Sequence, residues 1–86
     1  MLRITPTPDP SDRLRLNVEG RLTERTAEDL VSSCEQGFAA ERQVALDLSG
    51  LTFVDPDGLE ALSRLIAKGA VPVRCTPYLE ELLRRR

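Results

Sequence analysis

Strict alternation of apolar and polar residues predicts two long strands in this chain. Residues 13–19 place leucine or valine at every second position, and residues 43–48 repeat the pattern. We expect the first strand to end at Gly20 and the second at a turn formed by residues 49–50. Parallel strands covered on both faces are continuously apolar, so this alternation indicates helices mainly on one face of the sheet. The other face is then partly open to water or to a partner.

Two shorter segments complete the predicted sheet. Residues 2–5 are expected to form an edge strand, because the prolines at positions 6, 8 and 10 block further pairing. Residues 71–74 are also expected to form a short strand, and Pro72 within it favours an edge position.

Three helices are predicted from their first residues and from apolar residues at helical spacing. The first is expected to begin at Thr26. The second has Asp55 as its N-cap and Pro56 at its first position, and the third has Thr76 and Pro77 in the same roles. The order strand, strand, helix, strand, helix, strand, helix predicts an α/β fold in which helical crossovers join parallel strands.

Composition excludes several classes of function. With 12 basic and 14 acidic residues the net charge is −2, so no basic excess is available for nucleic acid. The chain has no histidine, which excludes Ser-His and Cys-His catalysis and histidine-based metal sites. No phosphate-binding glycine loop occurs either. We therefore expect a protein that is not an enzyme and needs no cofactor or metal.

Length and apolar content predict a single small domain in the cytoplasm. The 86 residues suffice for one modest core. The chain shows no export signal and no apolar run long enough for membrane insertion, so Cys34 and Cys75 are expected to stay reduced. The three aromatic residues, Phe38, Phe53 and Tyr78, are expected to fill the core.

The most specific motif lies in residues 46–59, which read LDLS at 46–49 and DPDG at 55–58. This segment resembles the central signature of STAS domains, the family of bacterial anti-sigma-factor antagonists. In that signature a strand ends in apolar-Asp-Leu-Ser, and Asp-Ser-Ser/Ala-Gly opens an amphipathic helix. The resemblance covers about residues 14–83. It implies a STAS-type mixed, mainly parallel four-stranded sheet with helices mainly on one face, in a single domain over residues 1–86.

Two departures from the family pattern affect the expected function. In signalling members the second serine of the motif is phosphorylated, whereas Asp57 holds that position here and Pro56 precedes it. A serine/threonine kinase cannot modify a carboxylate in the same way, so the usual phosphorylation switch is not expected. Typical members also carry a further strand after the last helix. Residues 71–74 are therefore expected to form a bare edge that can pair with another chain, for example in a homodimer.

The resemblance implies that the start of the second predicted helix binds a partner protein. The expected partner-binding residues are Thr52, Asp55, Pro56, Asp57, Gly58, Leu59 and Glu60. The implied partner is an anti-sigma factor or a related kinase-like ATPase. Two alternatives stay open: an accessory subunit that binds the ATPase of an ABC-type lipid transporter, and a nucleotide-binding module. The plainest interpretation of residues 55–58 is an ordinary helix start, since aspartate and proline both suit that place.

Overall fold

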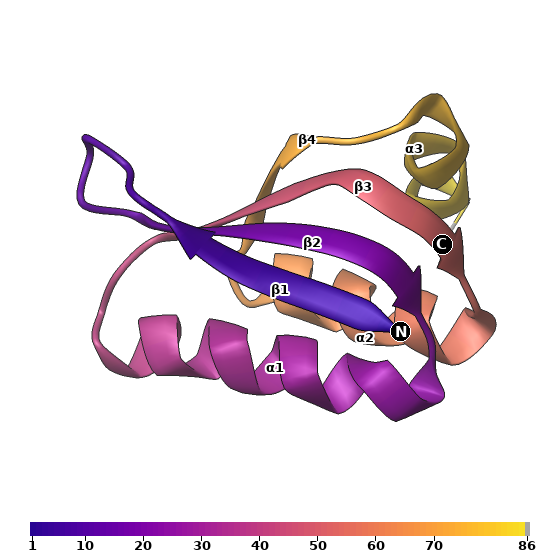
Figure 1. Cartoon of the computed structure of the whole chain (residues 1–86), viewed down its shortest axis with the longest axis horizontal. Coiled ribbons are helices and arrows are strands. Elements are labelled where there is room, and N and C mark those ends of the chain that lie inside the picture. Colours follow the sequence, from indigo (N-terminus) through magenta and orange to yellow (C-terminus); the bar gives the residue numbers. More distant parts are fainter. Residues whose placement is uncertain (86) are drawn as a thin grey trace.

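The computed structural model describes residues 1–85 and arranges them as a four-stranded sheet with three helices (Figure 1). The elements in chain order are β1 (Leu2–Thr7), β2 (Leu14–Leu22), α1 (Glu24–Ala39), β3 (Val44–Val54), α2 (Pro56–Ala67), β4 (Val71–Arg74) and α3 (Pro77–Arg84). The strand order is β1-β2-β3-β4; β1 runs antiparallel to β2, and the other two pairs are parallel. This confirms the predicted mixed, mainly parallel STAS-type sheet.

The core lies between the sheet and the two longer helices. Figure 1 shows α1 and α2 along the same side of the sheet, while α3 follows β4 and contacts α2. Fully buried leucines come from every layer, namely Leu16, Leu22, Leu30, Leu46, Leu48, Leu62, Leu65 and Leu79. In β2 the residues between the buried ones, among them Arg15 and Asn17, form the opposite, polar face of the sheet; in β3 the residues on that face, Ala45 and Asp47, are themselves buried. The alternation in the sequence therefore reflects a sheet with one apolar and one polar face.

Both long strands extend further than the alternation predicted. β2 continues through Gly20, which takes a positive φ of 102°, and β3 continues through residues 49–50 without the expected turn. The register between β2 and β3 shifts between Asn17 and Glu19 and again between Gly20 and Arg21. Gly20, which predicts a strand end, and residues 49–50, which predict a turn, thus lie at β-bulges. In a bulge, one strand contains an extra residue and the pairing continues beyond it.

Two further boundaries differ from the prediction, the end of β1 and the start of α1, and both differences have local causes. β1 includes Pro6, which lies opposite Leu16, because an edge strand tolerates a proline whose missing N–H would face away from its neighbour. α1 begins one turn earlier than predicted, with Thr23 as N-cap. Thr26, the residue expected as the cap, instead accepts a hydrogen bond from the Thr23 backbone N–H at 2.9 Å. The predicted starts of α2 and α3 are confirmed.

No helix within residues 1–85 has the length and apolar content needed to cross a membrane. Cys34 is buried and Cys75 is half-buried, and both are free thiols. Burial raises the pKa of Cys34 to about 11, so this thiol stays protonated at neutral pH.

Candidate functional site

The residue that organises the candidate site is Asp55, which lies between β3 and α2. One of its carboxylate oxygens, Oδ1, accepts a hydrogen bond from the Gly58 N–H at 2.7 Å and so caps α2. The other, Oδ2, accepts from the N–H of Glu24 at 3.2 Å, and Glu24 is the first residue of α1. A single carboxylate therefore satisfies free N–H groups at the amino ends of two helices, where the helix dipoles favour its negative charge.

Gly58 allows α2 to approach the end of β2. A Cβ atom at this position would collide with the backbone carbonyl of Leu22, lying 2.9 Å from its carbon. The Asp55 N–H donates to the same Leu22 carbonyl at 3.0 Å. Leu59, the next residue along, is half-buried and packs against the core. Asp55, Gly58 and Leu59 therefore fix the geometry of the junction between β3 and α2.

Asp57 differs from these residues because it is exposed and makes no contact of its own. Within residues 1–85 its carboxylate forms no hydrogen bond or ion pair. It is the second residue of α2, so its charge lies in the first turn, beside the positive end of the helix dipole. Pro56 beside it is also exposed. These two residues present a fixed negative charge to solvent on a well-anchored helix start.

The remaining predicted residues flank this charge. Thr52 is exposed, but its hydroxyl donates to the Gly20 carbonyl at 3.0 Å across the β2–β3 pair. Glu60 is half-buried and lies 3.6 Å from Arg64 one turn further along α2. The structure thus brings all seven predicted residues to one junction, where some have clear structural roles and others face solvent.

Phe53 is exposed beside the junction and is not among the predicted partner-binding residues. Phe53 was expected in the core but is 37% exposed, and the guanidinium carbon of Arg21 lies 4.5 Å from the centroid of its ring. This is a cation–π distance. Phe53 precedes buried Val54 in β3, so strand alternation was the available signal that it points outward. Tyr78, also expected in the core, is 55% exposed.

The LDLS motif has a structural role on the polar face of the sheet. Asp47 is only 9% exposed; its Oδ1 accepts from the backbone N–H and the hydroxyl of Ser49, at 3.1 and 2.7 Å. Its Oδ2 lies 3.4 Å from a guanidinium nitrogen of Arg15. The hydrogen bond from the Ser49 hydroxyl, with those from the Ser49 backbone and Arg15, holds the pKa of Asp47 below its usual value. This ionised carboxylate thereby holds the bulged part of β3 in place.

Comparison with solved structures places the fold among known ones. The unphosphorylated form of the anti-sigma factor antagonist SpoIIAA superposes with a TM-score of 0.70 at 13% identity, covering 98% of this chain and 84% of SpoIIAA. An uncharacterised protein of the DUF3478 family from Shewanella loihica PV-4, described as having a SpoIIAA-like fold, gives 0.63 at 16% identity, covering 98% and 75%. The structure of Mglu gives 0.62 at 23% identity over 81% of this chain, which corresponds to 19% of Mglu. At these identities the likeness concerns the fold.

Comparison at the level of sequence identifies the family. No curated protein matches the chain. Residues 7–74, however, match the family model described as "Mlab, STAS domain", which spans β2, α1, β3, α2 and β4. Together with the SpoIIAA-like fold, this match shows that the chain belongs to the STAS domain family.

Proposed function

We propose that residues 1–86 act as a single, non-catalytic domain that binds a partner protein through the start of α2, in the manner of an anti-sigma-factor antagonist. The observation that carries this proposal is the exposed carboxylate of Asp57, which has no partner within residues 1–85. Asp55 anchors the helix start that presents it. The SpoIIAA-like fold supports the type of module, because SpoIIAA is itself an antagonist of an anti-sigma factor.

The proposed α2 docking surface consists of Thr52, Asp55, Pro56, Asp57, Gly58, Leu59 and Glu60. Within it, Pro56 and Asp57 contact the partner directly, while Asp55 and Gly58 hold the junction in shape. Phe53, stacked with Arg21 at the margin, adds an aromatic contact of the kind that contributes strongly to protein interfaces. The matching group on the partner is a basic side chain facing Asp57.

The partner that best fits this surface is an anti-sigma factor or a related kinase-like ATPase. In a phosphorylated relative, a phosphoserine at this place would carry nearly two negative charges, and its phosphate would be added and removed reversibly. Asp57 supplies one charge permanently. In this proposal the partner accepts that charge, so the complex is constitutive and is not released by a kinase.

Charge reversal at Asp57 tests this surface. Tagged wild type, Asp57→Arg and Asp29→Arg are expressed in the native host, and co-purified proteins are identified by mass spectrometry. Asp29 is exposed on α1, so Asp29→Arg makes the same charge change away from the docking surface. We expect Asp57→Arg to lose the main partner, with affinity at least about tenfold weaker in a purified assay. Asp29→Arg should retain it, and an unchanged partner set for Asp57→Arg would refute the α2 docking surface.

A second candidate function is an accessory subunit bound to the ATPase of an ABC-type lipid transporter. The absence of a hydroxyl at position 57 favours it, because a permanent subunit needs no switch. Co-purification separates the two candidates, since one predicts an ABC-type ATPase and the other an anti-sigma factor or kinase-like ATPase.

A further inference from the structure

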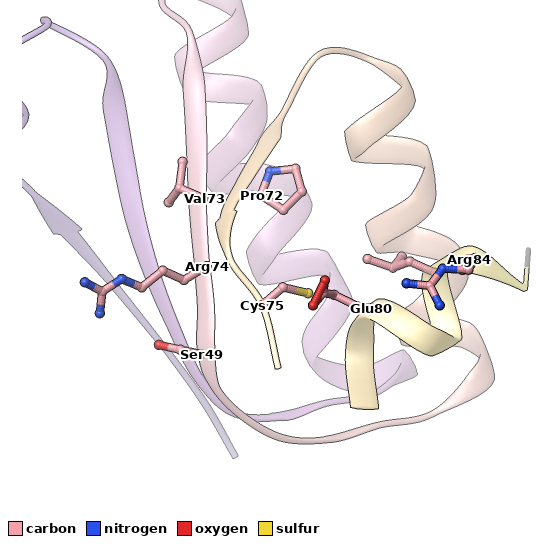
Figure 2. Close-up of a pocket in the computed structure, with 8 residues that line it drawn as sticks. Ser49, Pro72, Val73, Arg74, Cys75, Glu80 and Arg84 are labelled. Atoms are coloured by element: carbon pink, nitrogen blue, oxygen red, sulfur yellow. The ribbon is translucent and has the colours of Figure 1, made fainter. Parts of the chain in front are cut away.

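The two cysteine thiols are chemically reactive groups in principle, but the structure suppresses the reactivity of both. Cys34 is buried, and its pKa is raised to about 11. Cys75 lines a groove beside β4, where Figure 2 shows it next to Glu80. Burial, and then the negative charge of Glu80, raise the pKa of Cys75. Because the thiolate is the reactive form, neither cysteine is prone to modification at neutral pH.

The peptide bond between Asp57 and Gly58 is a second place where covalent change can begin. In an Asp-Gly sequence the glycine nitrogen can attack the aspartate side chain, because glycine has no Cβ to hinder the approach. Asp57 is the only aspartate in the sequence that glycine follows, whereas Asp9 and Asp55 are followed by proline, which has no N–H. The Asp57 carboxylate is exposed and has no partner within residues 1–85, so no contact protects it directly.

This attack isomerises aspartate in two steps that release and then consume water. In the first, the Gly58 nitrogen bonds to Cγ of protonated Asp57, and the Cγ hydroxyl leaves with the amide proton as water. The product is a cyclic succinimide. In the second, water adds to one of the two imide carbonyls. Cleavage of the nitrogen–Cγ bond restores aspartate, whereas cleavage of the bond to the main-chain carbon leaves isoaspartate, whose backbone runs through Cβ and Cγ and is one methylene longer.

The fold restrains the nitrogen that must attack. The Gly58 N–H donates to Oδ1 of Asp55 at 2.7 Å, which holds this amide in the first turn of α2. Gly58 has no room to shift toward β2, because even a Cβ atom there would lie 2.9 Å from the carbonyl carbon of Leu22. Pro56 has a fixed φ and so stiffens the turn from the other side. Cyclisation therefore requires the first turn of α2 to open and the hydrogen bond to Asp55 to break.

We propose that Asp57 is a site of spontaneous isomerisation and that Asp55 sets the rate by keeping the first turn of α2 closed. The covalent change then occurs in molecules whose helix start has opened locally while the rest of the fold is intact. The lengthened backbone no longer fits the capped turn, so a transient opening leaves a permanent change. This inference concerns the chain itself and does not depend on partner binding through the α2 docking surface.

The test follows isoaspartate at position 57 while the full chain is incubated at neutral pH, with fragmentation mass spectrometry to locate the product. Folded wild type should isomerise about tenfold or more slowly than the same chain in guanidinium chloride, because a hydrogen bond to a charged group must break first. Asp55→Ala should remove most of this protection. Asp55→Asn keeps an acceptor oxygen for the Gly58 N–H and should retain most of it.

Three further variants assign the effect. Ile66→Val trims a half-buried side chain later in α2, so it destabilises the fold without altering the helix start and should isomerise as slowly as wild type. Asp57→Glu keeps the charge but should give no product, because its side chain would have to close a larger ring. Asp55→Gly also lacks the acceptor and is a better cap than alanine, so it replaces Asp55→Ala if circular dichroism shows that Asp55→Ala is unfolded.

Several results would overturn the proposal. Equal rates in folded and denatured wild type would show that the helix start gives no protection. An unchanged rate in the folded variant that lacks the Asp55 acceptor would show that Asp55 does not provide it. Equal acceleration by Ile66→Val would assign the reaction to global unfolding, and isoaspartate confined to other aspartates would place the reactive site elsewhere.

Discussion

At the scale of single residues, the DPDG motif separates the shape of the junction from its charge. Asp55 and Gly58 determine how α2 starts, while Asp57 adds an exposed carboxylate. The sequence identified the helix start from residues 55 and 56, because capping is a local signal. It did not reveal that Asp55 also binds Glu24, because that contact joins residues 31 apart in the chain.

Removing each aspartate in turn should separate these roles. Asp55→Ala should lower the free energy of unfolding by about 1–2 kcal/mol, because α2 loses its cap and Glu24 loses an acceptor. Asp57→Ala removes only a dipole interaction and should cost roughly 0.3–1 kcal/mol. Urea unfolding of both variants measures the difference. Equal losses would mean that Asp55 has no special role.

Gly58→Ala should destabilise the protein even though alanine is the better helix former. The added Cβ would push α2 away from the Leu22 carbonyl, and we expect a loss of about 1–3 kcal/mol. Ser63→Ala is a suitable control in the same helix, because the Ser63 hydroxyl is buried without a hydrogen-bond partner in residues 1–85. That variant should be neutral or slightly stabilising. Thermal unfolding compares the two, and a neutral Gly58→Ala would contradict the close-approach argument.

At the scale of elements, boundaries that depend on local sequence signals were predicted well, whereas features that depend on long-range strand pairing were not. Prolines and caps predicted the starts of α2 and α3. The predicted ends of β2 and β3 were wrong, because Gly20 suggests a strand end and Ser49-Gly50 suggests a turn, and only the strand pairing shows that bulges lie there instead. The candidate site was found as a continuous segment, whereas the stacking of Arg21 on Phe53 depends on the register between two strands.

Acid should weaken the protein through Asp47. Because its pKa in the folded state lies below the usual 3.8, the unfolded chain takes up the proton first as pH falls. The stabilisation by ionised Asp47 is therefore complete above the usual pKa and is lost as pH falls through the folded value. Urea unfolding at a series of pH values should show wild type and Asp47→Asn converging in stability at low pH.

A variant of the hydrogen-bond donor checks the cause. Ser49→Ala should raise the pKa of Asp47 toward its usual value, measured by NMR titration of the carboxyl carbon, because the Ser49 hydroxyl is the main source of the shift. An unchanged titration would assign the shift to the Ser49 backbone, to Arg15 or to the charge of Arg74 instead.

At the scale of the whole molecule, charge is distributed unevenly between the sheet and the helices. The strands carry four arginines and two acidic residues, whereas α1 and α2 together carry two arginines and six acidic residues. Although the net charge of the chain is only −2, the sheet is basic and the layer formed by α1 and α2 is acidic. The α2 docking surface lies in the acidic helical layer, which suits a basic partner.

The anchoring of α2 by Asp55 bears on how such a module can diversify. Neither hydrogen bond by which Asp55 anchors α2 involves the side chain at position 57, so a substitution there changes the exposed charge and leaves this anchoring in place. Serine in place of Asp57 would restore a hydroxyl where signalling members of the family are modified. A permanently bound adaptor and a reversibly phosphorylated signalling protein would then differ at a single residue of the same fold.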